Sequence, residues 1–163
     1  MDSNKFDYGL YSPCLLNKLT DNEPHIRSEN YSKKVSVNVI KEDVLNNISM
    51  ILNSKSRINS SKLQGDSVLL DSVLAFGLED FCGENKSEES LNKLQNAIIK
   101  QIKTFEPRLK KTSLEVKLLS SGESLNYLYH FEISGIIEIG SITDKVVFKT
   151  SLDLENGSVK VSV

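Results

Sequence analysis

The feature that most constrains the fold is a change in hydrophobic period at the seam F-E-P-R-L, Phe105 to Leu109. Before this seam, apolar residues recur every three or four positions, as on one face of an α-helix: Leu91, Leu94, Ile98, Ile102 and Phe105. After it, apolar and polar residues alternate, as in a half-buried β-strand. Because proline disfavours the helical conformation of the residue before it, Pro107 should end the helix near Phe105 or Glu106. The sequence therefore predicts helices followed by strands.

Two more segments before the seam carry helical patterns. Residues 36–54 place six apolar side chains at helical spacing: Ile40, Val44, Leu45, Ile48, Ile51 and Leu52. Ser36 is a suitable N-cap for this helix, and Ser87 is one for the helix that ends at the seam. A short apolar helix is also expected in D-S-V-L-L-D-S-V-L-A-F-G, residues 66–77, with Gly77 at its end.

Three alternating segments and a short final one follow the seam. Their apolar residues keep one parity in each segment: Leu114, Val116 and Leu118, then Tyr127, Tyr129, Phe131, Ile133, Ile137 and Ile139, then Val146, Phe148, Leu152 and Leu154. The dipeptide Asn156-Gly157 predicts a hairpin with a two-residue loop before S-V-K-V-S-V. Charged residues hold the opposite parity, so that face should meet water. The predicted fold is α+β, with two to three helices followed by a roughly four-stranded antiparallel sheet and the helices packed on one face.

The first 34 residues are polar and contain two prolines, so we expect an N-terminal arm over 1–34 and a single α+β domain over 35–163. One apolar island lies in the arm, and a helical turn would place its three leucines on one side: Leu15, Leu16 and Leu19. Two interpretations are equally good. The turn folds back on its own domain, or it anchors the chain in a partner.

Charge and composition exclude several classes of protein. A formal net charge of -2 over 163 residues argues against a general binder of nucleic acid or of membrane surfaces. No apolar run approaches the ~20 residues that cross a bilayer, and the start M-D-S-N-K-F-D-Y lacks the pattern of a signal peptide. Cys14 and Cys82 form no C-x-x-C pair, and the chain has only two histidines, so neither a metal site nor a cofactor is expected. We expect a cytosolic protein with reduced thiols.

No catalytic motif stands out, and we expect that the chain is not an enzyme. His25 lies in the polar arm, and His130 has the parity of the solvated strand face. Glycoside hydrolysis needs only two carboxyl groups across a cleft, and three pairs are available: Glu79 with Asp80, Glu88 with Glu89, and Asp21 with Glu23. Each pair has a plainer role, as loop polarity, as charge at a helix N-terminus or as part of a solvated arm.

The Glu-Pro-Arg triplet at the seam has two interpretations. If the chain is extended there, the side chains of Glu106 and Arg108 point to the same side of Pro107. They could form a local surface ion pair, worth about 0 to 1 kcal/mol. Alternatively the pair faces outward, and Arg108 grips a partner carboxylate through two parallel hydrogen bonds. Phe105 and Leu109 would then hold the turn to the core.

Four segments resemble a known family, and they occur in its order: L-L-N-K-L-T-D-N-E-P, V-L-N-N-I-S-M-I-L-N, S-V-L-A-F-G-L-E-D-F and A-I-I-K-Q-I-K-T-F-E-P-R-L. They are similar to the lysozyme-like baseplate wedge proteins of contractile phage tails, and most closely to their type VI secretion counterparts, the TssE proteins. The resemblance runs from about residue 13 to the last strand. The seam F-E-P-R-L after an amphipathic helix is its most specific part.

The resemblance implies a structural role in the baseplate of a type VI secretion system. Wedge partners TssF, TssG and TssK are implied, with Glu106, Pro107 and Arg108 holding the helical core of the wedge. The fold is implied to template the first ring of the TssB–TssC sheath. An open sheet edge can accept a partner strand by main-chain hydrogen bonds, and S-V-K-V-S-V is the edge expected. The implied place is a cytoplasmic baseplate docked at the inner membrane.

Two other functions stay open at this point. One is a peptidoglycan-cleaving, lysozyme-like enzyme, although no catalytic acid pair of such an enzyme can be matched onto this chain. The other is the equivalent baseplate subunit of a phage tail or of another contractile injection particle.

Overall fold

The computed structural model describes residues 15, 19, 20, 24, 25, 27, 37–56, 67–81, 87–121, 128–139 and 142–162. The chain divides into two compact units, residues 1–44 and 45–163, and the division falls inside helix α2 (Val37–Asn53). In the first unit, Leu15 and Leu19 are helical, and Ile40 and Val44 of α2 are buried. The predicted domain boundary after residue 34 falls outside the described residues and stays a prediction.

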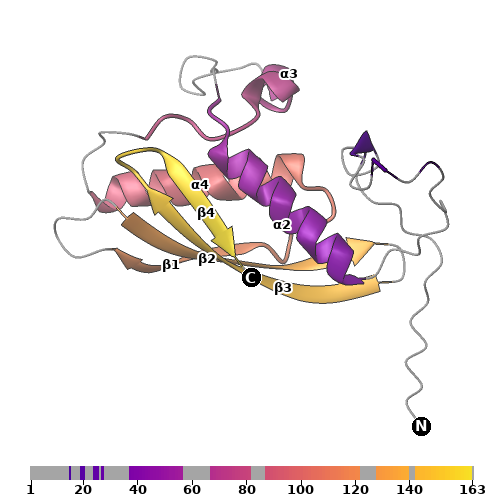
Figure 1. Ribbon diagram of the computed structural model, residues 1–163. Helices are drawn as coiled ribbons and strands as arrows, with labels where there is room; N and C mark the ends of the chain where they lie inside the picture. The colour runs from indigo at the N-terminus through magenta and orange to yellow at the C-terminus, as the bar shows by residue number, and fades with distance from the viewer. Residues whose placement is uncertain are drawn as a thin grey trace, which may run out of the picture. The chain divides into compact units, whose positions relative to one another are not determined.

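The second unit contains the end of α2, two short helical segments, one long helix and a sheet. The short segments are α3 (Ser67–Leu70) and the 3-10 helix η2 (Val73–Ala75), and the long helix is α4 (Glu88–Phe105). The strands are β1 (Glu115–Ser121), β2 (Leu128–Ile139), β3 (Ile142–Asp153) and β4 (Ser158–Ser162). All neighbours pair antiparallel in the order β1-β2-β3-β4 (Figure 1). The predicted α+β fold, with helices first and four antiparallel strands after them, is confirmed.

Helix α4 begins and ends where its sequence predicts. The hydroxyl of Ser87 accepts a hydrogen bond from the N–H of Ser90 at 3.1 Å, which is an N-cap. Two glutamates occupy the first turn, where the helix dipole favours negative charge. The apolar stripe of this helix is buried at three successive turns: Leu94, Ile98 and Ile102.

The alternation in the strands predicts the buried face of the sheet. The side chains on that face include the bulkiest of the core: Tyr129, Phe131, Ile133, Ile137 and Phe148. Figure 1 shows α4 and the C-terminal half of α2 on the same side of the sheet. Leu118 is an exception, since the register of β1 shifts between Leu118 and Ser120 and the Leu118 side chain is exposed. Tyr127 lies outside the described residues.

The prediction of a single helix over residues 66–77 is wrong, because the chain forms two short helical segments there. The chain turns at Asp71 and Ser72, between α3 and η2. The hydroxyl of Ser72 donates to the carbonyl oxygen of Leu69 at 2.7 Å, and such a side-chain bond to the backbone competes with helix continuation. Gly77 follows η2 with φ of 100°, the left-handed conformation that glycine adopts readily.

The predicted hairpin between β3 and β4 is confirmed, but the predicted loop length of two residues is wrong. Four residues, Leu154 to Gly157, separate the strands, and only Gly157 among them has a positive φ. The carboxylate of Asp153 accepts a hydrogen bond from the N–H of Glu155 at 2.8 Å and one from Nδ2 of Asn156 at 2.9 Å. These side-chain bonds hold a wider loop than an Asn-Gly turn requires.

Candidate partner-binding site

The F-E-P-R-L seam forms a tight turn at the end of α4. The N–H of Glu106 donates to the carbonyl oxygen of Ile102 at 2.9 Å, and the N–H of Leu109 donates to that of Glu106 at 3.3 Å. Proline suits the second position of such a turn because its ring fixes φ at about -65°. The chain is therefore not extended at Pro107, because a turn follows the helix directly.

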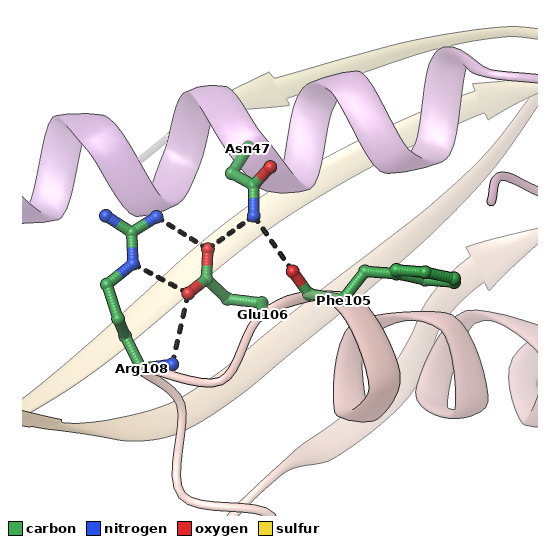
Figure 2. A network of polar contacts seen from close by, with 4 residues as sticks. All are labelled: Asn47, Phe105, Glu106 and Arg108. Atoms are coloured by element: carbon green, nitrogen blue, oxygen red, sulfur yellow. Dashed lines mark hydrogen bonds and ion pairs between the residues drawn. The ribbon is translucent and has the colours of Figure 1, made fainter. Parts of the chain in front are cut away.

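Glu106 and Arg108 form an ion pair with two parallel hydrogen bonds inside this turn. Arg108 Nε donates to Oε1 of Glu106 at 2.7 Å and Nη2 donates to Oε2 at 2.7 Å (Figure 2). The N–H of Arg108 adds a bond to Oε1 at 3.2 Å. The Glu106 side chain is fully buried, whereas that of Arg108 is 23% exposed. The local ion pair is thus present, with its carboxylate in the interior and not on the surface.

Asn47 of α2 completes the environment of the buried carboxylate. Its Nδ2 donates to Oε2 of Glu106 at 2.7 Å and to the carbonyl oxygen of Phe105 at 3.2 Å (Figure 2). Each of the two carboxylate oxygens therefore accepts two hydrogen bonds. Of these four bonds, Arg108 donates three and Asn47 donates one. A buried charge is tolerated when it is paired and hydrogen-bonded in this way. The arrangement joins α2 to the end of α4.

Leu109 fixes the other side of the turn to the sheet. Its side chain is buried, and the residue forms an isolated antiparallel bridge with Ile137 of β2. The N–H of Lys110 donates to the carbonyl oxygen of Ile136 at 2.9 Å, and the N–H of Glu138 donates to that of Arg108 at 2.9 Å. The turn is therefore held by a helix on one side and by a strand on the other.

A second contact holds the S-V-L-A-F-G-L segment against α4. The ring of Phe76 packs edge-on against Phe105, with centroids 5.1 Å apart and an angle of 74° between the planes. The amide of Gln101 donates from Nε2 to the carbonyl oxygen of Ala75 at 2.9 Å and accepts from the N–H of Gly77 at 3.2 Å. Two of the family-like segments are thus joined at the same end of α4.

The predicted partner-binding residues differ in what they present to solvent. Pro107 is exposed, Arg108 is half-buried and Glu106 is interior. The side chains of Leu15 and Leu19 are 71% and 75% exposed, and Leu16 lies outside the described residues. Binding of a partner by either set stays a prediction.

The carboxylate pairs considered for glycoside hydrolysis have ordinary surroundings where they are described. Glu88 and Glu89 lie in the first turn of α4, and Asp80 forms an exposed ion pair with Lys55 at 3.3 Å. A pocket of about 20 Å³ lies near Asp80, which is room for about one water molecule. Asp21 and Glu23 lie outside the described residues. None of the helices described is both long and apolar enough to span a bilayer.

The sequence did not predict the roles of two amide side chains. Asn47 holds the Glu106–Arg108 turn, and Gln101 holds the segment around Ala75 and Gly77. The available signal was weak. Asn47 lies between Val44 and Ile48 in α2, and a polar residue beside a buried stripe often has a specific hydrogen-bond partner. Which partner it finds depends on how the helices pack.

The buried Glu-Arg turn and the long helix before it lie within a match to a known family. The family model of baseplate wedge protein gp25 matches residues 38–140, which is more than half of the chain, and the chain belongs to this family. The family supplies structural components of baseplates, and TssE proteins are among its members. Searches of curated proteins and of solved structures found no significant match.

Proposed function

We propose that this chain is a baseplate subunit of a type VI secretion system. It docks in the wedge with TssF, TssG and TssK, and it templates the first ring of the TssB–TssC sheath. The observation that carries the proposal is the Glu106–Arg108 turn, whose buried ion pair holds the exposed Pro107 in place inside the family-matched region. The working place of the subunit is then a cytoplasmic baseplate docked at the inner membrane.

The wedge contact follows from the rigidity of the turn. A protein that binds through a feature already held in place loses little conformational freedom on binding. Pro107 is presented at the surface while Leu109 and Glu106 are buried beneath it. The Arg108 side chain is 23% exposed, and its guanidinium can donate hydrogen bonds to a carbonyl or carboxylate of a partner. In this proposal the buried carboxylate orients the arginine, and the partner contacts its outer side.

The proposed sheath contact uses an edge of the sheet, since β4 is the last strand in the order of the described sheet. Main-chain groups at a sheet edge can pair with a strand of another chain. The Leu15–Leu19 turn is the second proposed wedge anchor, because apolar side chains exposed on a helical turn gain by burial against a partner.

The same role in a phage tail or another contractile injection particle is the second candidate, because the family includes baseplate wedge proteins. Genes next to this one separate the two candidates. Sheath, wedge and membrane-complex genes of a secretion system favour the first, and capsid and tail-fibre genes favour the second.

The test is capture of partners by the tagged full chain from host lysate, identified by mass spectrometry. The wild type should recover wedge and sheath subunits. Arg108→Lys keeps a cation beside Glu106 but loses the planar guanidinium with its two parallel hydrogen bonds. This variant should fold and should capture sheath subunits but no wedge subunits. Lys93→Arg is the matched control, since Lys93 pairs with Glu89 on the surface of α4 at 3.0 Å.

Two results would contradict the proposal. Recovery of no baseplate or sheath subunit by the wild type removes the assembly role. A loss of folded structure in Arg108→Lys, seen by circular dichroism, makes the turn a stability element only. The enzyme alternative is tested by adding the wild-type chain to purified cell walls, whose turbidity should not fall.

A further inference from the structure

The outer edge of β3 is only partly covered by β4. The five residues of β4 pair with Lys149 to Asp153, whereas β3 begins at Ile142. Figure 1 shows β3 continuing past the end of β4. Within the described ranges, the stretch Thr143 to Val147 pairs with β2 on one side and with no strand on the other. We call this stretch the β3 lane.

The direction of the main-chain groups in the β3 lane follows from Val159. Both its N–H and its carbonyl oxygen bond to the side chain of Asn53, so both point away from β3. In an antiparallel pair, residues whose N–H and carbonyl groups point away from the neighbouring strand alternate with residues whose N–H and carbonyl groups point toward it. Val159 pairs with Leu152, so the main-chain groups of Leu152 point away from β4. The main-chain groups of Asp153, and of every second residue of β3 before Asp153, point toward the β4 side. In the lane these residues are Thr143, Lys145 and Val147.

The outer edge of β4 is closed by Asn53, the last residue of α2. Its Nδ2 donates to the carbonyl oxygen of Val159 at 2.9 Å, and its Oδ1 accepts from the N–H of Val159 at 3.0 Å. A further bond from Nδ2 to the carbonyl oxygen of Ser49 at 2.8 Å holds the amide in place. Asn53 therefore occupies the position that a partner strand would take. Among the described residues of β4, only Val161 still directs main-chain groups outward.

We propose that a partner strand docks in the β3 lane, in line with β4, and that Asn53 excludes it from the outer edge of β4. The lane offers three residues with outward N–H and carbonyl groups, whereas the β4 edge offers one. The inference rests on the proposed sheath contact and specifies where that contact lies. It differs from the expectation that S-V-K-V-S-V is the receiving edge.

The side chains around the lane define the partner strand. Val146 is buried on the inner face of the lane, so the partner residue beside it extends the core and is apolar. Lys145 is exposed on the outer face of the lane, so the partner residue beside it is acidic. The occupant is therefore an extended segment of another protein with an apolar residue beside Val146 and an acidic residue beside Lys145.

A matched pair of charge reversals tests the lane in the full-length chain. Lys145→Glu lies in the lane, and Lys160→Glu makes the same change at an exposed position of β4. Capture of sheath subunits from host lysate, quantified by mass spectrometry, should fall about tenfold with Lys145→Glu and stay near the wild-type level with Lys160→Glu. Equal capture by both variants, or a larger loss with Lys160→Glu, overturns the proposal.

A second pair tests the main-chain contact itself. Lys145→Pro removes an N–H that points into the lane, and Val161→Pro removes one that points out from β4. Lys145→Ala and Val161→Ala keep these N–H groups and are the controls. Loss of sheath capture with Lys145→Pro alone supports the lane. Loss of sheath capture with Val161→Pro, or with neither proline variant, overturns the lane proposal. If the wild type captures no sheath subunit, the proposed sheath role itself is refuted.

Discussion

The two flanks of the central β2–β3 hairpin differ in how completely they are covered. On the β2 flank, β1 pairs with Tyr129 to Ser134, and the segment after Pro107 continues the cover through bonds to Ile136 and Glu138. On the β3 flank, β4 covers only Lys149 to Asp153 within the described residues. The difference teaches that the seam has two roles, because it ends α4 and also closes one edge of the sheet.

The flanks also differ in the chemistry that holds them to the helices. The closed flank depends on a buried ion pair, in which Glu106 is held by Arg108 and Asn47. The open flank depends on a neutral amide, Asn53, which bonds to the main chain of Val159. Removal of one member of a buried ion pair costs more than loss of a neutral hydrogen bond. Perturbation of the closed flank should therefore be the more damaging.

The largest effect is expected from Arg108→Ala, which removes the guanidinium and leaves the buried Glu106 carboxylate with only neutral donors, the amide of Asn47 and the main-chain N–H of residue 108. The free energy of unfolding should fall by about 3 kcal/mol, measured by urea denaturation at neutral pH. Lys93→Ala breaks an exposed pair near the start of α4 and should cost less than about 0.5 kcal/mol. A similar small cost for both variants would show that the ion pair does not hold the closed flank. Glu106→Gln added to Arg108→Ala should recover part of the loss.

An intermediate effect is expected from Asn53→Ala, which uncovers the main chain of Val159 at the edge of β4. Two hydrogen bonds are lost at a position that water can reach, so the free energy of unfolding should fall by about 1 to 2 kcal/mol. The amide of Val159 should exchange with deuterium faster, while that of Lys160 should not change. Asn46→Ala removes the same side chain from an exposed position of α2 and is the control. Unchanged exchange at Val159 would contradict the capping role of Asn53.

A smaller effect of opposite sign is expected from Thr150→Val on the inner face of β3. Within the described part of the chain, Oγ1 of Thr150 is buried and has no hydrogen-bond partner. Valine keeps the shape and removes the unpaired hydroxyl, so the free energy of unfolding should rise by about 1 kcal/mol. Thr143→Val makes the same change at an exposed position and should have little effect. A loss of stability in Thr150→Val would mean that the hydroxyl has a partner in solution.

The smallest effect is expected at Asp153, in the hairpin that joins β3 to β4. The N–H of Glu155 lowers the pKa of this carboxyl below its ordinary 3.8, and bonds from Asn156 add to the shift. The charged form is therefore favoured in the folded state, and its contribution to stability is present above pH 3.8 and is lost as the pH falls through the lower folded pKa. Wild type should exceed Asp153→Ala in stability at pH 7, and the difference should shrink below pH 3.8 in denaturation curves. A difference that is constant with pH would assign the effect to loop packing.

The sequence alone predicted the order of the elements, because each depends on local rules. Hydrophobic period separates α4 from the strands, Ser87 and Pro107 mark the ends of that helix, and the parity of Tyr129 and Phe131 identifies the buried face. The two local errors, in residues 66–77 and in the Asn156-Gly157 loop, came from Ser72 and Asp153. The side chains of these two residues bond to nearby backbone or side-chain groups and change the turn.

Only the tertiary structure decided what the polar residues of the site do. Asn47 meets Glu106 across 59 positions of sequence, and Asn53 meets Val159 across 106. An amide side chain carries no local sign of its partner, because the partner is selected by how the helix packs on the sheet. The triplet Glu106-Pro107-Arg108 was visible in the sequence as a helix stop. Its buried carboxylate, the arginine side chain that pairs with it, and the part of β3 that no other described strand pairs with beyond β2 follow from packing between distant segments.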